Sequence, residues 1–259
     1  EEAIEITKIY SVSGLLNNDY LVKKRPFRSP HHTASPSSLI GGGRVPKPGE
    51  VSLAHHGVLF LDELPEFQKK VLEVLRQPLE DGFVTISRVS ATLTYPADFM
   101  LVASMNPCPC GYFGDPNHEC TCSQNSIDNY LNKISNPLLD RIDIHTEVMP
   151  VDYFDLNKDV KSESSRDIKN RVNNARKMQI ERYFKEGIFS NGQLSAKNIK
   201  KYCKLNNNAA KIMKEAFNKF KFSARSYNKI LKVSRTIADL DGEKTIHERH
   251  LLEAIQYRS

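Results

Sequence analysis

The fold is decided by residues 57–64, which read Gly57-Val58-Leu59-Phe60-Leu61-Asp62-Glu63-Leu64. Here four consecutive apolar residues end in two adjacent carboxylates. A short apolar run without alternation is typical of a strand buried on both faces of a parallel sheet. Such sheets bind their ligands at the carboxyl ends of the strands. The sequence therefore predicts that Asp62 and Glu63 lie at a functional edge.

Two carboxylates at a strand end suit the hydrolysis of a nucleotide. In P-loop NTPases the first carboxylate helps to hold Mg²⁺, and a second one beside it can polarise the attacking water as a general base. The alternative interpretation is a buried strand followed by an ordinary acidic turn, and the pair alone does not decide between the two.

The phosphate-binding loop that accompanies such a pair, G-x-x-x-x-G-K-[ST], occurs nowhere in the sequence. The nearest candidate, Gly41–Lys47, has the wrong spacing and no Ser or Thr after its lysine. The chain opens with Glu1 and continues at once as a helical pattern. We therefore expect a fragment without its P-loop strand, which would lie beside the Asp62 strand. Such a fragment would expose apolar sheet surface and would not hydrolyse ATP alone.

The composition is that of an ordinary globular protein of one large or two smaller domains. Of its 259 residues, 39% are hydrophobic and 26% are charged. A formal charge of +6 permits contact with nucleic acid without requiring it. No signal peptide and no apolar stretch of membrane-spanning length is visible, so we expect a cytoplasmic protein with no membrane partner.

Four of the five cysteines fall within fifteen positions: Cys108, Cys110, Cys120 and Cys122. Disulfides are disfavoured in a reducing cytosol, whereas two C-x-C pairs separated by a loop can supply four thiolates to Zn²⁺. The alternative is four reduced thiols in a flexible loop. His118 is a possible replacement for one sulfur, and the isolated Cys203 is expected to be a core residue.

Residues 1–155 carry the pattern of an α/β layer. Two apolar strands, ending at Asp62 and near Ala103, are each followed by polar residues. The other elements expected are an opening helix, an extended segment at 25–32, an irregular insertion at 36–50, a helix over 65–79, a β-hairpin over 84–95, a helix carrying Ile127 and Tyr130, and a strand over 142–148.

From about Ser165 the pattern becomes purely helical, so residues 156–259 are predicted to form an all-α bundle. A long basic helix is followed by helices over 195–203, 207–220 and 223–240. Ser195 and Ser223 are placed as N-caps, and Asp241-Gly242 as a stop. Thr245-x-x-Glu248 is interpreted as the capping box of a last helix.

Several long motifs span nearly the entire chain: Arg25–His32, Leu39–Gly43, Pro48–Gly57, Asn106–Gly111, Pro137–Asp143 and Ser223–Tyr227. They resemble the magnesium-chelatase-like family of AAA+ ATPases, in its ComM/YifB branch of bacterial competence proteins. The resemblance implies an incomplete AAA+ core at 1–155, with a parallel sheet, helices and a pre-sensor β-hairpin, followed by a helical lid. In that family a Lon-protease-like domain and the P-loop precede this region.

The resemblance also implies a role for each candidate site residue. Asp62 supports Mg²⁺ and Glu63 activates the water. Asn106 resembles the sensor 1 residue, although an Asn-Pro turn residue is the alternative. Arg141 resembles an arginine finger that acts on the neighbouring subunit's nucleotide, which implies a ring; its alternative is a local salt bridge to Asp140 or Asp143. Arg225 resembles sensor 2 at a helix N-terminus.

Other residues receive weaker interpretations. The insertion and the hairpin resemble elements that project into the pore of ring motors. Arg88 at the hairpin is either a phosphate contact or an ordinary exposed arginine. We expect the pairs His31-His32 and His55-His56 to be structural, or to position the residues that contact the ligand, and not to bind metal. Arg235 is expected to be a solvated surface charge.

Three functions remain open at this point. The first is an ATP-driven hexameric motor on DNA, with helicase or branch-migration activity, as the ComM/YifB branch implies. The second is a chelatase-type motor that remodels a partner for insertion of Mg²⁺ into a porphyrin. The third is an interaction module without motor activity, formed by the cysteine loop and the helical region.

Overall fold

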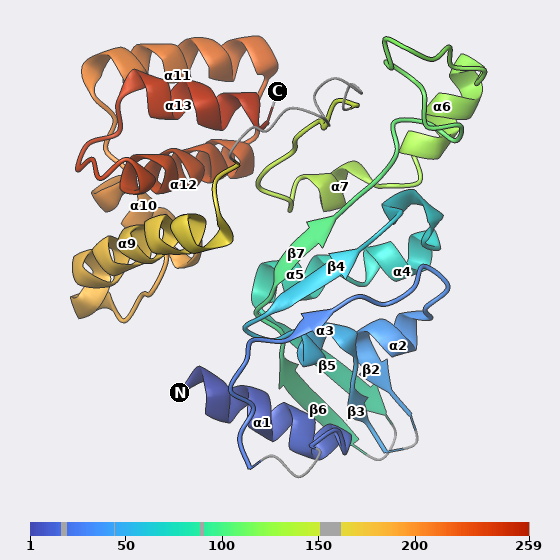
Figure 1. The fold of residues 1–259 in the computed structure, drawn as a ribbon. Helices are drawn as coiled ribbons and strands as arrows, with labels where there is room; N and C mark the ends of the chain where they lie inside the picture. The colour runs from blue at the N-terminus through green and yellow to red at the C-terminus, as the bar shows by residue number, and fades with distance from the viewer. Residues whose placement is uncertain (17–19, 44, 89–90, 151–161, 259) are drawn as a thin grey trace. The chain divides into compact units, whose positions relative to one another are not determined.

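The computed structural model of the chain describes residues 1–16, 20–43, 45–88, 91–150 and 162–258 (Figure 1). The chain divides into two compact units, Glu1–Ile142 and Asp143–Ser259. The domain boundary expected from the sequence, after residue 155, lies outside the described residues.

The first unit contains a three-stranded parallel sheet, two small antiparallel pairs and short helices. Its elements are α1 (Glu2–Ser13), β1 (Phe27–Arg28), α2 (Pro36–Ile40), β2 (Gly41–Gly42), β3 (Lys47–Pro48), α3 (Glu50–Leu53), β4 (Val58–Leu61), the 3₁₀ helix η1 (Leu64–Glu66), α4 (Lys69–Glu73), α5 (Arg76–Asp81), β5 (Phe83–Arg88), β6 (Ala91–Pro96), β7 (Met100–Ala103), α6 (Gln124–Leu131) and α7 (Asn136–Leu139).

The parallel sheet has the strand order β1-β4-β7, so the strand before Asp62 is paired on both sides. Val58 pairs with Phe27 on one side and with Met100 on the other, and Leu61 pairs with Ala103. This corrects the expectation that a P-loop strand lies beside the Asp62 strand, since both edges of β4 are already occupied.

One face of this sheet is buried and the other is not. Leu59 and Leu61 are fully buried against α2 to α5, and Figure 1 shows α4 and α5 behind β4. The opposite face carries Phe27 and Met100, each 65% exposed, and Val102, which is 40% exposed. The predicted burial on both faces is therefore wrong, whereas the expected exposure of apolar sheet surface is confirmed.

The predicted β-hairpin is confirmed as β5 and β6. Val84 and Ile86 face the core, whereas Thr85 and Thr94 face outward and lie opposite one another with their hydroxyls 3.2 Å apart. The side chain of Arg88 and the hairpin tip lie outside the described residues.

Three sequence predictions for residues 36–148 are wrong. The helix expected over 65–79 is divided into η1, α4 and α5: the non-helical backbone of Phe67 and Gln68 separates η1 from α4, and Pro78 has no N–H to donate to the carbonyl of Val74 at the junction of α4 and α5. The insertion at 36–50 is not irregular, since Ser35 caps α2 and a Gly-rich turn pairs β2 with β3. Residues 142–148 form no strand within the described chain, and Val148 there is 87% exposed.

The described elements of the second unit are all helices, as predicted, apart from a single β-bridge between Leu205 and Ile246. Its elements are α9 (Ser165–Tyr183), the 3₁₀ helices η2 (Phe184–Glu186) and η3 (Asn191–Gln193), α10 (Ala196–Tyr202), α11 (Asn207–Phe220), α12 (Ala224–Leu240) and α13 (Glu248–Gln256). Ser195 and Ser223 cap α10 and α12 through their side chains, as predicted. The capping box expected at Thr245 and Glu248 is wrong, because α13 begins at Glu248 with His247 as its N-cap.

A network of buried charges lies at the centre of this unit. Asp239 accepts hydrogen bonds from Arg182 at 3.0 Å, from Arg235 at 3.1 Å and from Asn191 at 2.9 Å. Arg235 is 1% exposed and also donates to the carbonyl of Lys244. The prediction that Arg235 is a solvated surface charge is therefore wrong. None of the described helices is both long and apolar enough to span a membrane.

Candidate active site and cysteine cluster

Asp62 lies at the carboxyl end of β4, directly beside Ser104 at the end of β7. Because Leu61 pairs with Ala103, the residues that follow them leave the sheet at the same edge. The Ser104 hydroxyl donates to Oδ1 of Asp62, and the Ser104 N–H donates to the carbonyl of Leu61 at 3.0 Å. The Asp62 carboxylate is exposed and is held in one orientation by the neighbouring strand.

Glu63, the residue after Asp62, has an unusual backbone conformation. Its φ of 51° and ψ of 50° lie in the left-handed region, which costs a non-glycine residue on the order of 1–2 kcal/mol. Its backbone N–H donates to Oδ1 of Asp62 at 3.1 Å. The side chain is 56% exposed, so this carboxylate is open to a water molecule or a ligand.

His32 reaches the same edge from the strand on the other side. It follows β1, whose carboxyl end points the same way as that of β4. Nδ1 of His32 lies 3.3 Å from the Glu63 carboxylate, and its ring packs edge-on against Phe67. Sequence reasoning left His32 with only a supporting role. The rule that parallel strands end at one edge could have placed it beside Glu63.

Asn106 follows β7 by three residues and is exposed. Its backbone hydrogen bonds to Tyr130 of α6. Burial raises the pKa of Tyr130, and the nearby Glu66 and Glu63 carboxylates raise it further, although the bond from Asn106 acts in the opposite direction. Asn106 is thus anchored through its main chain, which leaves its amide side chain exposed.

Arg141 is held by local contacts within the first unit. Its guanidinium donates to the carbonyl of Arg76 at 3.0 Å and to that of Pro137 at 2.7 Å, and it forms an ion pair with Glu80. The side chain is only 11% exposed. Contact with a neighbouring subunit's nucleotide would require the pairing with Glu80 to open. Arg225 lies in the first turn of α12, in the second unit.

Four sulfur atoms meet in the loop between β7 and α6, and we refer to Cys108, Cys110, Cys120 and Cys122 as the cysteine cluster. Sγ of Cys108 lies 3.4 Å from that of Cys110 and 3.7 Å from that of Cys120, while Cys110 and Cys120 are 3.6 Å apart. All four sulfurs lie within 4.8 Å of one another, and all are free thiols. His118 does not join them but stacks on Tyr112.

A second group of potential ligands, Glu5 with His55 and His56, is a hydrogen-bonded cluster. The backbone N–H of Asp98 donates to Nδ1 of His55 at 3.1 Å, so Nε2 of His55 carries the proton. That Nε2 lies 3.2 Å from the Glu5 carboxylate, and Nε2 of His56 lies 2.8 Å from it. Because the Nε2 lone pair of His55 is not free for a metal, the geometry favours the structural interpretation of this pair.

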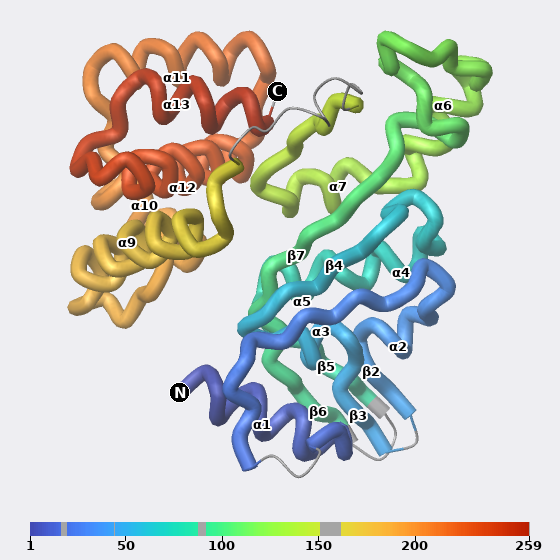
Figure 2. Tube along the Cα trace, in the orientation of Figure 1, coloured from blue at the N-terminus to red at the C-terminus, as the bar shows by residue number. Residues whose placement is uncertain are grey.

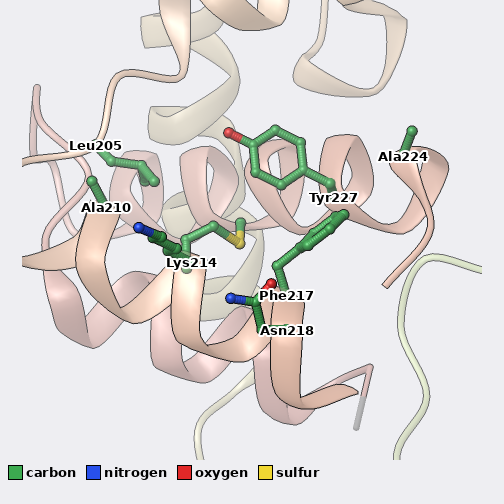
Figure 3. A pocket seen from close by; sticks show the side chains of 8 residues that line it. Leu205, Ala210, Lys214, Phe217, Asn218, Ala224 and Tyr227 are labelled. Atoms are coloured by element: carbon green, nitrogen blue, oxygen red, sulfur yellow. The ribbon is translucent and has the colours of Figure 1, made fainter. Parts of the chain in front are cut away.

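A hollow of about 490 Å³ in the second unit contains none of the predicted site residues. Figure 3 shows Phe217 of α11 and Tyr227 of α12 side by side in its wall, with the amine of Lys214 nearby. The two rings meet edge to face, with their centroids 6.1 Å apart. Its lining is mostly apolar, unlike the carboxylate edge of the first unit.

The parallel sheet, the β-hairpin and the helical second unit together define a fold consistent with an AAA+-like core and lid. The chain belongs to the magnesium-chelatase family: residues 1–156 match the family described as "Magnesium chelatase, subunit ChlI", and residues 162–258 match "Magnesium chelatase, subunit ChlI C-terminal". The predicted family is thereby confirmed.

The similarity to individual proteins supports the ComM/YifB branch. The chain is 47% identical to the competence protein ComM of Haemophilus influenzae and 43% identical to the protein YifB of Escherichia coli, in both cases over 100% of this chain and 50% of the relative. It is 34% identical to the magnesium-chelatase 67 kDa subunit of Chlorobaculum parvum over 27% of this chain and 12% of that protein. The chain thus spans about half the length of ComM and YifB.

Proposed function

We propose that this chain is part of an ATP-driven motor that acts on DNA as a hexameric ring. The observation that carries the proposal is the carboxylate pair at the end of β4, with Asp62 fixed by Ser104 and Glu63 open to solvent. The ComM/YifB branch supports DNA as the substrate and helicase or branch migration as the activity. The phosphate-binding loop would come from a part of the protein outside these residues.

The residues of the sheet edge fit the cofactors ATP and Mg²⁺. Within the described chain, hydrogen bonds reach Oδ1 of Asp62 only, so Oδ2 is available as a hard oxygen ligand. When bound, Mg²⁺ would neutralise charge that develops on the transferred phosphoryl group. Glu63 would take the proton of the attacking water, with His32 orienting its carboxylate, and the Asn106 amide would position that water.

The ring follows from the proposed role of Arg141. An arginine that stabilises the phosphoryl group of a neighbour's nucleotide requires head-to-tail subunits. In this proposal assembly replaces the Glu80 pairing of Arg141 with a contact across the subunit interface. Arg225, with its charge at the start of α12, would contact the phosphates from the second unit.

Two further assignments belong to this proposal. The cytoplasm is the proposed compartment, since a reducing environment keeps the free cysteines as thiols. Zn²⁺ is the proposed metal of the cysteine cluster, separate from the Mg²⁺ of the carboxylate edge.

The decisive experiment is a Glu63→Gln substitution in the full-length protein. Loss of a general base should lower ATP turnover by about 100-fold or more while ATP binding is retained. Glu66→Gln is the matched control, because Glu66 is an exposed carboxylate on the next turn and pairs with Lys133. Equal turnover of Glu63→Gln and the unmodified protein would refute the assignment of the base.

A chelatase-type motor is the second candidate, favoured by the local similarity to a magnesium-chelatase subunit. The two motors differ in what stimulates hydrolysis. ATP turnover of the full-length protein should rise with single-stranded or forked DNA and not with porphyrin and Mg²⁺. Stimulation by porphyrin alone would favour the chelatase, and no stimulation by either would favour an interaction module.

A further inference from the structure

We propose that the cysteine cluster binds a single Zn²⁺ ion and that this ion, in place of an apolar core, folds the loop between β7 and α6. A tetrahedral site with Zn–S bonds of about 2.3 Å has sulfur atoms about 3.8 Å apart. Three of the six sulfur separations in the cluster, those among Cys108, Cys110 and Cys120, are 3.4, 3.6 and 3.7 Å, and the sulfur of Cys122 lies within 4.8 Å of the others. The first three thiols are therefore arranged close to one face of that tetrahedron with the fourth within reach, whereas a disulfide requires a separation near 2.05 Å.

The donor set selects the metal and the role of the site. Four soft thiolates favour Zn²⁺ over Mg²⁺ or Ca²⁺, which take oxygen ligands. Four protein ligands also leave no open coordination position, which is the arrangement of structural and not of catalytic zinc. Binding releases the thiol protons to solvent, and a zinc ion with four thiolates carries a net charge of −2.

Backbone groups around the sulfurs are oriented as in a ligand site. The N–H of Phe113 donates to Sγ of Cys108 at 3.3 Å, and the N–H of Tyr112 bonds to the Cys110 sulfur. Gly111, which lies between Cys110 and Tyr112 in the chain, has a φ of +87°, a conformation that glycine adopts without strain. Hydrogen bonds of this kind hold metal ligands in place and stabilise their charge.

The loop has little else to hold it together. Residues 107–123 contain no helix or strand, and Cys108 is the one buried residue among them. The aromatic side chains Tyr112 and Phe113 are 44% and 46% exposed, so they do not form a core. A segment of this kind gains its folding free energy from the metal.

The two ends of the loop adjoin Asn106 and the start of α6. Cys108 follows Asn106 by two residues, and Cys122 directly precedes Ser123, the N-cap of α6. Figure 2 shows the loop (green) leaving β7 and folding back beside α6. One ion would therefore fix both the main chain next to Asn106 and the start of α6. The importance of Asn106 for ATP hydrolysis rests on the proposed motor function, whereas the metal site depends only on the geometry of the cysteine cluster.

The test is elemental analysis of the chain purified under reducing conditions without chelators. We expect about one equivalent of zinc, as for a closed structural site, and Co²⁺ substitution should give the intense visible absorption of tetrahedral cobalt thiolate. The double variant Cys110→Ser, Cys122→Ser should lose the metal. The control Cys203→Ala, which removes the buried fifth thiol of the second unit, should keep it.

The proposal is overturned if the unmodified chain holds less than about a tenth of an equivalent of zinc and gives no cobalt spectrum. It is also overturned if iron is the metal found, or if Cys203→Ala loses zinc as the double variant does. Neither measurement on the unmodified chain depends on whether a variant folds.

Hydrogen exchange tests the folding role separately. Removal of the metal should speed exchange at the amides of 104–113 and 123–127 and leave α9 to α13 unchanged. Unchanged exchange in the loop after zinc has been removed would overturn the claim that the ion folds it. ATP turnover is not the readout, so failure of the motor proposal would leave this result interpretable.

Discussion

At the residue scale, the most informative contact is the hydrogen bond from the Ser104 hydroxyl to the Asp62 carboxylate. It links two strand ends that lie 42 positions apart in the sequence and engages Oδ1 of Asp62, so that Oδ2 accepts no hydrogen bond within the described chain. A hydrogen bond to a charged group contributes roughly 1.5–3 kcal/mol. Ser104 is therefore a positioning residue for the carboxylate that the proposed function assigns to Mg²⁺.

We predict that Ser104→Ala weakens the response of the full-length protein to Mg²⁺. About 1.4 kcal/mol corresponds to a factor of ten, so the Mg²⁺ concentration for half-maximal ATP turnover should rise about tenfold or more. Ser104→Thr keeps the hydroxyl and should restore the original value. The same Mg²⁺ dependence in Ser104→Ala and the unmodified protein would contradict this role.

How far the site could be predicted also differs from residue to residue. The apolar run before Asp62 was sufficient to place the carboxylate pair at a strand end. The partner of Arg141 was not predictable, because Glu80 is 61 positions away and comes near only after α5 and α7 pack. Arg235 was misjudged because its partner Asp239, one helical turn away, becomes buried only when the helical unit closes around it.

At the scale of elements, the local sequence located several helix boundaries that carry a cap or stop residue, although the capping box expected at Thr245 was wrong. The ends of α12 follow from Ser223 and Asp241, which act through bonds to nearby backbone groups. The strand expected over 142–148 failed for the opposite reason, since a strand needs a partner that the local pattern does not contain. The helix expected over 65–79 failed because apolar periodicity does not reveal the non-helical backbone at Phe67 and Gln68.

We predict that acidification loosens α1. Hydrogen bonds from His56 and His55 lower the pKa of Glu5, and burial lowers the pKa of His55. A carboxylate or imidazole whose pKa is lower in the folded state than in the unfolded one loses its stabilising contribution as the pH falls. The loss should begin below the ordinary His value of 6.5 and continue below the ordinary Glu value of 4.5.

Hydrogen exchange of the α1 amides between pH 7 and about pH 4, corrected for intrinsic rates, measures this loss. Glu5→Gln should be less protected at pH 7 and should change less on acidification. Glu2→Gln is the control, because Glu2 pairs with Arg25 and with neither histidine ring. Constant protection of α1 over this pH range would show that the cluster does not hold the helix.

At the scale of the whole molecule, two separate cores imply two separate unfolding events. The first core is built on β4 and its covering helices, and the second surrounds Tyr183, Ile230 and Leu251. We predict that Asp239→Ala lowers the free energy of unfolding of the second unit by about 3–5 kcal/mol, because it leaves the buried guanidinium of Arg235 and the partly buried guanidinium of Arg182 without their shared carboxylate.

Denaturant unfolding followed by hydrogen exchange can resolve the two events. The first unit should unfold at the same denaturant concentration in Asp239→Ala as in the unmodified chain. Asp241→Ala, which removes a carboxylate that is 44% exposed, should have a much smaller effect. Equal destabilisation of both units by Asp239→Ala would mean that they unfold together.

The double pairing of β4 has a consequence for the energetics of assembly. Since β1 and β7 already fix the strand that ends directly before Asp62 and Glu63, little backbone conformational entropy remains to be lost there when a ligand binds. The conformational entropy lost on binding must then come mainly from the groups that other parts of the protein contribute to the site. Affinity for the nucleotide should accordingly respond more to the stiffness of those incoming groups than to changes within this sheet.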